Sequence, residues 1–317
     1  MIWTALRQHR AELISLGATL GVIGIFVLIT GHVVNGWYSD NGVSGCLAPT
    51  PPVTCTGVVG DFTSTFGTLV VIVALFAILP ALAGVFMGAP MLSREFERGT
   101  DGLAWTQSVT RWRWLTVKLV GIVLVGLLAA LILTGMLTWW RSPFDQVASR
   151  FADGFDVEGV VEIGYFLFAL SLGVLAGIVV RRTLAAMAIT LAAFVAVRGP
   201  IEFILRPRYQ SPVRVTAAPG TNVSIPGDAW RLTSQFIDGS GNSVTRQQIS
   251  QLCGTTGGFD RGQPLASPCL TAHGIVRETL YQPADRFWTF QFIELGIFLA
   301  LTVVCIAGVV VWMRRRA

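Results

Sequence analysis

The stretch LVGIVLVGLLAALILTGMLTWW, residues 119–140, decides the fold because it runs for 22 positions without a charged side chain. A helix that crosses the hydrocarbon core of a bilayer needs about 20 mostly apolar residues. The chain holds six runs of this kind, at residues 13–34, 66–88, 119–140, 160–180, 184–205 and 288–313. The sequence therefore predicts an all-α integral membrane protein with six transmembrane helices. The fifth run is the least regular, because Arg198, Pro200 and Glu202 interrupt its second half.

The composition supports the same fold class. Hydrophobic residues make up 53% of the chain and charged residues only 13%, whereas a typical soluble domain carries about 25% charged residues. Much of the positive charge is arginine at the ends of the apolar runs, and Lys118 is the single lysine. A nucleic-acid-binding protein would instead carry a basic stripe with interleaved aromatic residues on a soluble face. We therefore expect no nucleic-acid partner.

The positive residues also predict the orientation in the membrane. Short cytoplasmic loops are enriched in arginine and lysine, and with six spans all four positive clusters fall on one side, so both termini are expected to be cytoplasmic. The first run is too long for the apolar core of a signal peptide and is expected to remain as a signal anchor. The clusters are Arg7 with Arg10; Arg94, Arg98, Arg111, Arg113 and Lys118; Arg181 with Arg182; and Arg314, Arg315 and Arg316.

The spans divide the chain into four parts. Residues 1–12 mix apolar and basic side chains, which suits a short amphipathic helix on the cytoplasmic surface or a frayed basic tail. Residues 13–205 would hold the first five spans, with an inner loop at residues 89–118. Residues 206–287 would form an extracellular loop or cap, and residues 288–317 the sixth span and a basic tail.

The predicted cap is rich in Gly, Ser, Thr and Pro between residues 220 and 267, a composition typical of loops. Short helices are expected at residues 244–252 and 275–281. Pro283 is placed to open a helix that continues into the last span, because proline suits the first turn of a helix. We expect a small cap without a core of its own.

Two pairs of cysteines lie on the side predicted to face an oxidising exterior. Cys46 and Cys55 belong to the first outer loop, and Cys253 and Cys269 belong to the cap. Such short-range pairs suit two disulfides that staple the outer loops, and four free thiols are the alternative. His273 stands alone instead of at ligand spacing beside these cysteines, so no metal site is expected.

Several catalytic and nucleotide-binding motifs are absent from the sequence. There is no G-x-x-x-x-G-K-[ST] phosphate loop, no G-x-S-x-G elbow and no H-E-x-x-H zinc motif. We therefore expect no catalytic residue, no cofactor and no ATP bound in the manner of a phosphate loop. Energy for any transport would come from another subunit or from an ion gradient.

The stretch between the second and third predicted spans carries the most specific pattern. It reads SREFERGT at residues 93–100 and WTQSVTR at residues 105–111. This pattern, E-x-E-x-G-T…L…T-Q-S-V-T-R…W-L…K, resembles that of the membrane permeases of type-two ATP-binding-cassette (ABC) exporters. RQHR at residues 7–10 and YQPADRFWTFQ at residues 281–291 resemble a high-GC Gram-positive (actinobacterial) branch of that family. No motif that we recognise covers the segment between the last two spans.

The resemblance implies a permease subunit of the plasma membrane that exports a hydrophobic or amphipathic substrate. In that family two six-helix subunits pair, as a homodimer or with a second permease, and each docks a separate cytoplasmic ATPase that binds the ATP. The inner loop at residues 89–118 would couple the permease to the ATPase, with Glu95 and Glu97 as its charged contact. The matching positions most relevant to coupling are Glu95, Glu97, Gly99, Thr100 and Arg111.

Four ionisable residues fall in the outer third of the predicted spans: Glu162, Arg198, Glu202 and Glu294. Charges in a bilayer are rare and usually paired. Arg198 and Glu202 are four residues apart and could share a helix face, although Pro200 lies between them. One hypothesis is that Arg198, paired with Glu202 or Glu294, latches an outer gate. The alternative is that these side chains reach the membrane interface without a transport role.

Two other function classes stay open, together with the role of two glycine motifs. A membrane-embedded sensor or regulator would use the extracellular segment as a ligand-binding cap, and a polytopic enzyme would need catalytic side chains gathered at one depth.

Gly17-x-x-x-Gly21 and Gly173-x-x-x-Gly177 would let helices approach closely. We expect both motifs to pack within one subunit, with a dimer contact as the alternative.

Overall fold

The computed structural model describes residues 10–47, 55, 57–99, 111–218, 221, 225–253, 259–260, 263–264 and 268–315. Among them are six helices long and apolar enough to cross a membrane: Leu13–Asp40, Val58–Glu97, Trp112–Val147, Val161–Val180, Thr183–Arg208 and Ala284–Arg315. The six-span fold is therefore confirmed. The predicted amphipathic helix lies mostly outside the described residues, which begin at Arg10.

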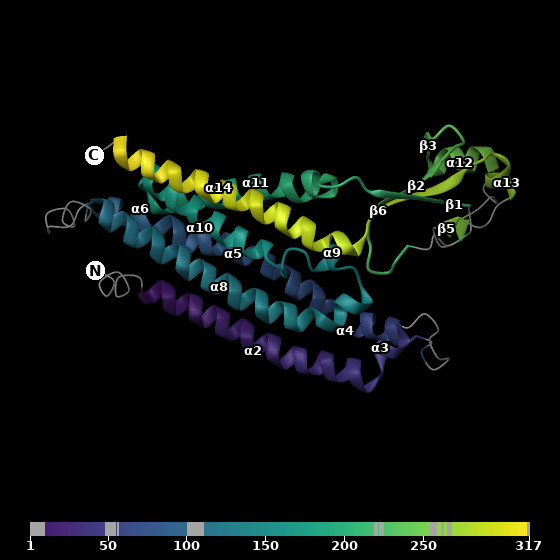
Figure 1. Cartoon of the computed structure of the whole chain (residues 1–317), viewed down its shortest axis with the longest axis horizontal. Helices are drawn as coiled ribbons and strands as arrows, with labels where there is room; N and C mark the ends of the chain where they lie inside the picture. The colour runs from purple at the N-terminus through teal and green to yellow at the C-terminus, as the bar shows by residue number, and fades with distance from the viewer. Residues whose placement is uncertain are drawn as a thin grey trace.

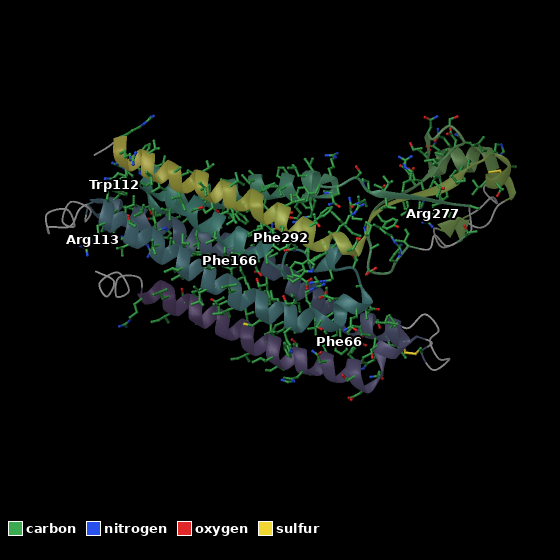
Figure 2. The ribbon with its side chains drawn as sticks, in the orientation of Figure 1. Phe66, Trp112, Arg113, Phe166, Arg277 and Phe292 are labelled. Carbon is green, nitrogen blue, oxygen red and sulfur yellow. A yellow bond between two sulfur atoms is a disulfide. The ribbon has the colours of Figure 1, made fainter. Side chains whose placement is uncertain are left out.

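The helices lie side by side, and the start of α2 and the end of α14 lie at the same end of the bundle (Figure 1). We call this the terminal end; Trp112 and Arg113 lie there (Figure 2). The opposite end, which we call the sheet end, carries a small β-sheet that holds Arg277 (Figure 2). The first and third spans are single helices, α2 (Arg10–Asp40) and α8 (Arg111–Val147).

The second span is a composite of helical types and not one regular helix. It begins after the short helix α3 (Val43–Cys46) and continues to Arg98, ten residues past the predicted boundary at residue 88. Its 3-10 turn ends just before Pro80, as expected where proline removes a backbone donor. Its parts are α4 (Val58–Ala74), η2 (Leu75–Ile78), α5 (Leu79–Ala83), the π-helix η3 (Gly84–Gly88) and α6 (Ala89–Arg98).

Residues 89–118, predicted as an inner loop, are helical wherever the structure describes them, apart from the turn at Gly99. α6 covers residues 89–98 and α8 begins at Arg111. The remaining spans are α10 (Val161–Val180), α11 (Thr183–Pro200) and α14 (Phe287–Arg315). A short helix α9 (Arg150–Asp153) precedes α10, and the 3-10 turn η6 (Ala284–Arg286) opens α14 as Pro283 predicted.

The fifth span continues past its predicted end at residue 205. After α11 the chain forms a π-helix, η4 (Ile201–Leu205), and then a 3-10 turn, η5 (Arg206–Arg208). The helical path therefore carries Arg206, the first residue of the predicted cap, at the sheet end of the span. Irregular backbone of this kind is tolerated at membrane depth where protein covers it.

α10 is the central helix, and glycines bring it into backbone contact with the second span. A Cβ added at Gly173 would lie 2.4 Å from the carbonyl oxygen of Gly84, and one at Gly177 would lie 2.5 Å from that of Ala89. The motif Gly173-x-x-x-Gly177 thus packs within the subunit, as expected. Apart from α2 itself, no described residue places an atom within 4 Å of a Cβ added at Gly17 or Gly21. Among the described residues that motif therefore makes no internal packing contact, contrary to expectation.

The cap contains a four-stranded antiparallel sheet in the order β1-β6-β2-β3. The expected helix at residues 275–281 is wrong, because strand β6 occupies that segment and pairs with β1 and β2. The cap also has a small core of Ile249, Leu270 and Ile275, contrary to expectation. Its elements are β1 (Val213–Ala217), β2 (Trp230–Ile237), β3 (Ser243–Val244), α12 (Arg246–Cys253), β4 (Phe259–Asp260), β5 (Gln263–Pro264), α13 (Pro268–Ala272) and β6 (Val276–Gln282).

Both predicted cysteine pairs are disulfides in this structure, Cys46–Cys55 and Cys253–Cys269. The second one ties α12 to α13 within the cap. Both disulfides lie at the sheet end, away from the chain termini (Figure 2).

Candidate functional site

A cluster of charged and phenolic side chains lies between the helices at the sheet end. We call it the sheet-end network. Its residues come from the loop before α10, from α10 itself, from the sheet end of the fifth span and the residue after it, and from α14. Its members are Asp156, Tyr165, Arg198, Glu202, Arg206, Tyr209 and Glu294.

Arg206 and Glu294 form the centre of the sheet-end network. Nε and Nη2 of Arg206 donate to the two carboxylate oxygens of Glu294 at 2.9 and 2.8 Å. Arg206 is only 4% exposed and Glu294 is fully buried. The hydroxyl of Tyr165 donates to Glu294 at 2.5 Å, and that of Tyr209 donates at 3.2 Å. A bidentate pair with this many added hydrogen bonds is the arrangement in which a buried ion pair can offset its desolvation.

Asp156 links both arginines of the network. Its Oδ1 lies 2.6 Å from Nη2 of Arg206 and 3.3 Å from Nη2 of Arg198. Burial raises the pKa of the Asp156 carboxyl, but Arg206 and Arg198 outweigh burial and hold it below its usual value. Asp156 is therefore ionised at neutral pH and bridges the two guanidinium groups.

Arg198 connects the network to the second span. Its Nη1 donates to the carbonyl oxygen of Ala77 at 2.7 Å, and its guanidinium lies 4.6 Å from the centre of the Tyr165 ring. Its Nε lies 3.7 Å from Oε2 of Glu202. The three sequence-predicted residues thus belong to one network, but Glu294 pairs with Arg206 and not with Arg198.

Sequence reasoning missed Arg206 because it placed this residue at the first position of the cap. The positions Arg198, Glu202 and Arg206 recur every four residues, which is the spacing of one helix face. This four-residue spacing, which continues past Pro200, is the sequence pattern that could have identified Arg206 as part of the same helix face. Glu162, the fourth predicted charge, lies outside the network; it is fully buried and accepts a hydrogen bond from Thr134 at 3.0 Å.

A second group of charges adjoins the network between α8, α9 and α14. Nε of Arg150 donates to Oε1 of Glu158 at 2.6 Å, and Arg141 lies 3.6 Å from the other oxygen of Glu158. Burial and the neighbouring Asp145 raise the pKa of Glu158 to about 7. The amide of Gln291 on α14 donates to the backbone of this loop, at 3.2 Å to the carbonyl oxygen of Glu158.

The predicted coupling acids lie at the terminal end, on α6, and both contact their own chain. Glu95 is buried and accepts a hydrogen bond from Nζ of Lys118 on α8. Oε2 of Glu97 accepts two bonds from Thr183, from the backbone N at 3.1 Å and from Oγ1 at 2.6 Å. Glu97 therefore caps the first turn of α11, where free backbone N–H groups favour a carboxylate.

The other three predicted coupling positions are only partly described. Gly99 ends α6 with a φ of 65°, a conformation that glycine adopts without strain. Arg111 is the first residue of α8. Thr100 lies outside the described residues. The role of all five positions toward an ATPase stays a prediction.

Comparison with known families identifies the class of this membrane protein. Residues 17–206 match the family described as ABC-2 membrane transporter related. Because the match covers more than half of the chain, the chain belongs to this family and is a multi-pass membrane transport subunit. Such subunits are generally not catalytic themselves and associate with an ATPase. No curated protein and no solved structure matches the chain.

Proposed function

We propose that this chain is one half of an exporter that moves a hydrophobic or amphipathic substrate across the plasma membrane. ATP hydrolysis in a separate subunit drives the movement. The observation that carries the proposal is the family match, which spans the first five helices of a six-helix frame. The absence of a phosphate loop from the sequence supports a separate ATPase. The motifs at residues 7–10 and 281–291 support the high-GC Gram-positive branch.

The terminal end faces the cytoplasm in this proposal. The four arginine-rich clusters support that orientation through the positive-inside rule. The two disulfides at the opposite end support it as well, because disulfides persist in oxidising compartments. The functional unit is a pair of permeases, identical or different, each bound to its ATPase.

The sheet-end network closes the outer side of the path. It joins four separate segments through the buried Arg206 side chain, which contacts both Glu294 and Asp156. An arrangement with this many charge-assisted bonds has discrete made and broken states, as a latch requires. Arg206, instead of Arg198, is its central residue.

The fifth span connects the latch to the ATPase side. At the terminal end Glu97 of α6 holds the first residue of α11, Thr183. At the sheet end the same span carries Arg198 and Arg206. A displacement of α6 by an ATPase would therefore act directly on the span that carries the latch.

The test is to purify the full chain together with a candidate stand-alone ABC ATPase from the same organism. ATP hydrolysis by the complex in lipid is then measured against a series of hydrophobic and amphipathic compounds. Co-purification with hydrolysis stimulated by one compound class supports the proposal. A chain that binds no ATPase under these conditions contradicts it.

A sensor or regulator is the second candidate, and the folded cap favours it. The cap has a four-stranded sheet, a small core and a disulfide. A sensor would bind a ligand through the cap and would not move it. Saturable ligand binding that is lost when the cap is altered, without any transport of that ligand into vesicles, would favour this candidate over the exporter.

A further inference from the structure

The corner between α12 and α13 holds three potential metal ligands. Cys253 ends α12, Cys269 lies on α13, and His273 follows α13 four residues after Cys269. Nδ1 of His273 lies 3.7 Å from Sγ of Cys269. The expectation that His273 stands alone is wrong, because one helical turn brings its ring beside the disulfide.

The distances fit a tetrahedral metal site once the disulfide is open. Metal–sulfur bonds of about 2.3 Å and metal–nitrogen bonds of about 2.0–2.1 Å place two tetrahedral ligands about 3.6 Å apart. The observed separation of 3.7 Å between Nδ1 and Sγ of Cys269 is close to that value. Ligand atoms of all three residues lie within 4.8 Å of one another. Among the described residues no other group of three such ligands meets this criterion.

We propose that the cap is a redox-switched site for a thiophilic cation such as Zn²⁺ or Cu⁺. A dithiol reductant gives two electrons and two protons to the Cys253–Cys269 disulfide and itself becomes a disulfide. The two sulfurs then separate to about 3.8 Å, the distance between tetrahedral thiolates. The cation displaces one proton from each thiol and binds both sulfurs and His273.

His273 is able to provide the third ligand in its neutral form. Its Nδ1 also lies 2.9 Å from the carbonyl oxygen of Cys269. With the ring proton on Nε2, Nδ1 gives up that contact and turns its lone pair to the cation. The fourth position stays open to water or to another donor, as in three-ligand zinc sites. This inference does not rest on the proposed transport function.

The cation would take over the mechanical role of the disulfide. When the disulfide is formed, it ties α12 to α13, whose side chains Ile249 and Leu270 belong to the small core of the cap. In the dithiol state the cation ties the same two helices through the same two sulfurs. The cap therefore stays folded in both redox states, provided that the cation is present.

The experiment uses the full chain in detergent, with a purification tag that contains no histidine. Cys46→Ser with Cys55→Ser removes the other disulfide and serves as the working background. This protein is reduced with a phosphine, the phosphine is removed under anaerobic conditions, and the reduced protein is titrated with Co²⁺. We expect one Co²⁺ per chain, with thiolate-to-cobalt charge-transfer bands and tetrahedral visible bands, and displacement by Zn²⁺.

Three variants test the ligand set. Adding His273→Ala to the background should weaken Co²⁺ binding by about tenfold or more, because loss of a residue that only supports a metal ligand already costs about 10–100-fold in affinity. His32→Ala, on α2 in the membrane, is the matched control and should leave it unchanged. Adding Cys253→Ser with Cys269→Ser should abolish it. Circular dichroism checks that each variant keeps its fold before titration.

Several outcomes would overturn the proposal. One is equally tight Co²⁺ binding by the oxidised chain, because the sulfurs of a disulfide are not thiolate ligands. Another is binding by the reduced chain that His273→Ala leaves unchanged. A reduced, folded chain that takes up no stoichiometric Co²⁺ overturns it as well.

Discussion

Arg206 is the central side chain of the sheet-end network. It is 4% exposed and contacts two carboxylates, Glu294 and Asp156. Removing one partner of a buried ion pair leaves the other charge without compensation, at a cost of about 3–5 kcal/mol. Arg206→Gln should therefore lower the unfolding temperature of the purified chain markedly. Arg208→Gln, at an exposed position two residues on, should stay within about 0.5 kcal/mol of wild type. Equal effects of the two changes would contradict the network.

Glu158 should make the stability of the protein depend on pH near neutrality. Burial and Asp145 raise its pKa from 4.5 to about 7. Because the folded pKa is the higher one, the stabilising contribution is complete below pH 4.5 and is lost as pH rises through about 7. We expect the unfolding midpoint to fall from pH 5 to pH 8 more steeply in wild type than in Glu158→Gln. The amide keeps an oxygen for Arg150, and parallel curves would contradict the assignment.

The sequence predicted the chemistry of the network better than its pairing. Arg198, Glu202 and Glu294 were found because charges within apolar runs are unusual. The partner of Glu294 could not be found in the same way, since it depends on where a π-helix and a 3-10 turn deliver Arg206. Asp156 lies in a loop before α10, and its approach to both arginines is a property of the folded chain alone.

At the scale of elements, the contact between α10 and the second span depends on glycine. A Cβ at Gly173 would lie 2.4 Å from a backbone oxygen, which no side-chain adjustment relieves. Gly173→Ala should therefore destabilise the protein by about 1–3 kcal/mol, the usual cost of overpacking. Gly17→Ala, where nothing lies within 4 Å, is the control and should be neutral in the isolated chain. Thermal unfolding of both variants in detergent measures the difference.

The contact of Glu97 with the first turn of α11 gives a second prediction at this scale. Glu97→Ala removes both hydrogen bonds from Thr183 at the start of α11, and Thr183→Val removes the one from Oγ1; each change should cost about 1 kcal/mol. Because the two residues contact each other, the double variant should cost less than the sum of the two single ones. Additive effects on the unfolding free energy would place Glu97 outside this contact.

The same pair of variants separates two roles of Glu97 in the proposed complex. If Glu97 acts through α11, Thr183→Val should reduce substrate-stimulated ATP hydrolysis without releasing the ATPase. If Glu97 instead binds the ATPase, Glu97→Ala should reduce co-purification while Thr183→Val leaves it intact.

Strand β6 shows why local sequence was insufficient within the cap. Its segment, VRETLYQ, has β-branched and aromatic residues but also a central Glu and Leu that suit a helix. Its two partner strands begin at Val213 and Trp230, far away in the sequence. Strand pairing over such separations overrides the local helix preference. The seven residues of β6 alone do not indicate which strands they pair with.

At the scale of the whole molecule, the six-span frame was predictable because the bilayer sets the length of each apolar run. The order of the helices in space was not predictable. α10 is centrally placed, although its sequence is less apolar than that of the second, third and sixth spans. Gly173 and Gly177 allow the second span to pack closely against α10 because they have no side chains. α10 also packs against α6, α11 and α14.

The central position of α10 has a consequence for the route of any cargo. Backbone contact between α10 and the second span leaves no room there even for a methyl group. Cargo therefore cannot pass between α10 and the second span, whereas apolar side chains such as Val22, Leu184 and Val303 are exposed on the outside of the single chain. In the proposed pair of permeases, each copy would then supply one wall of the passage.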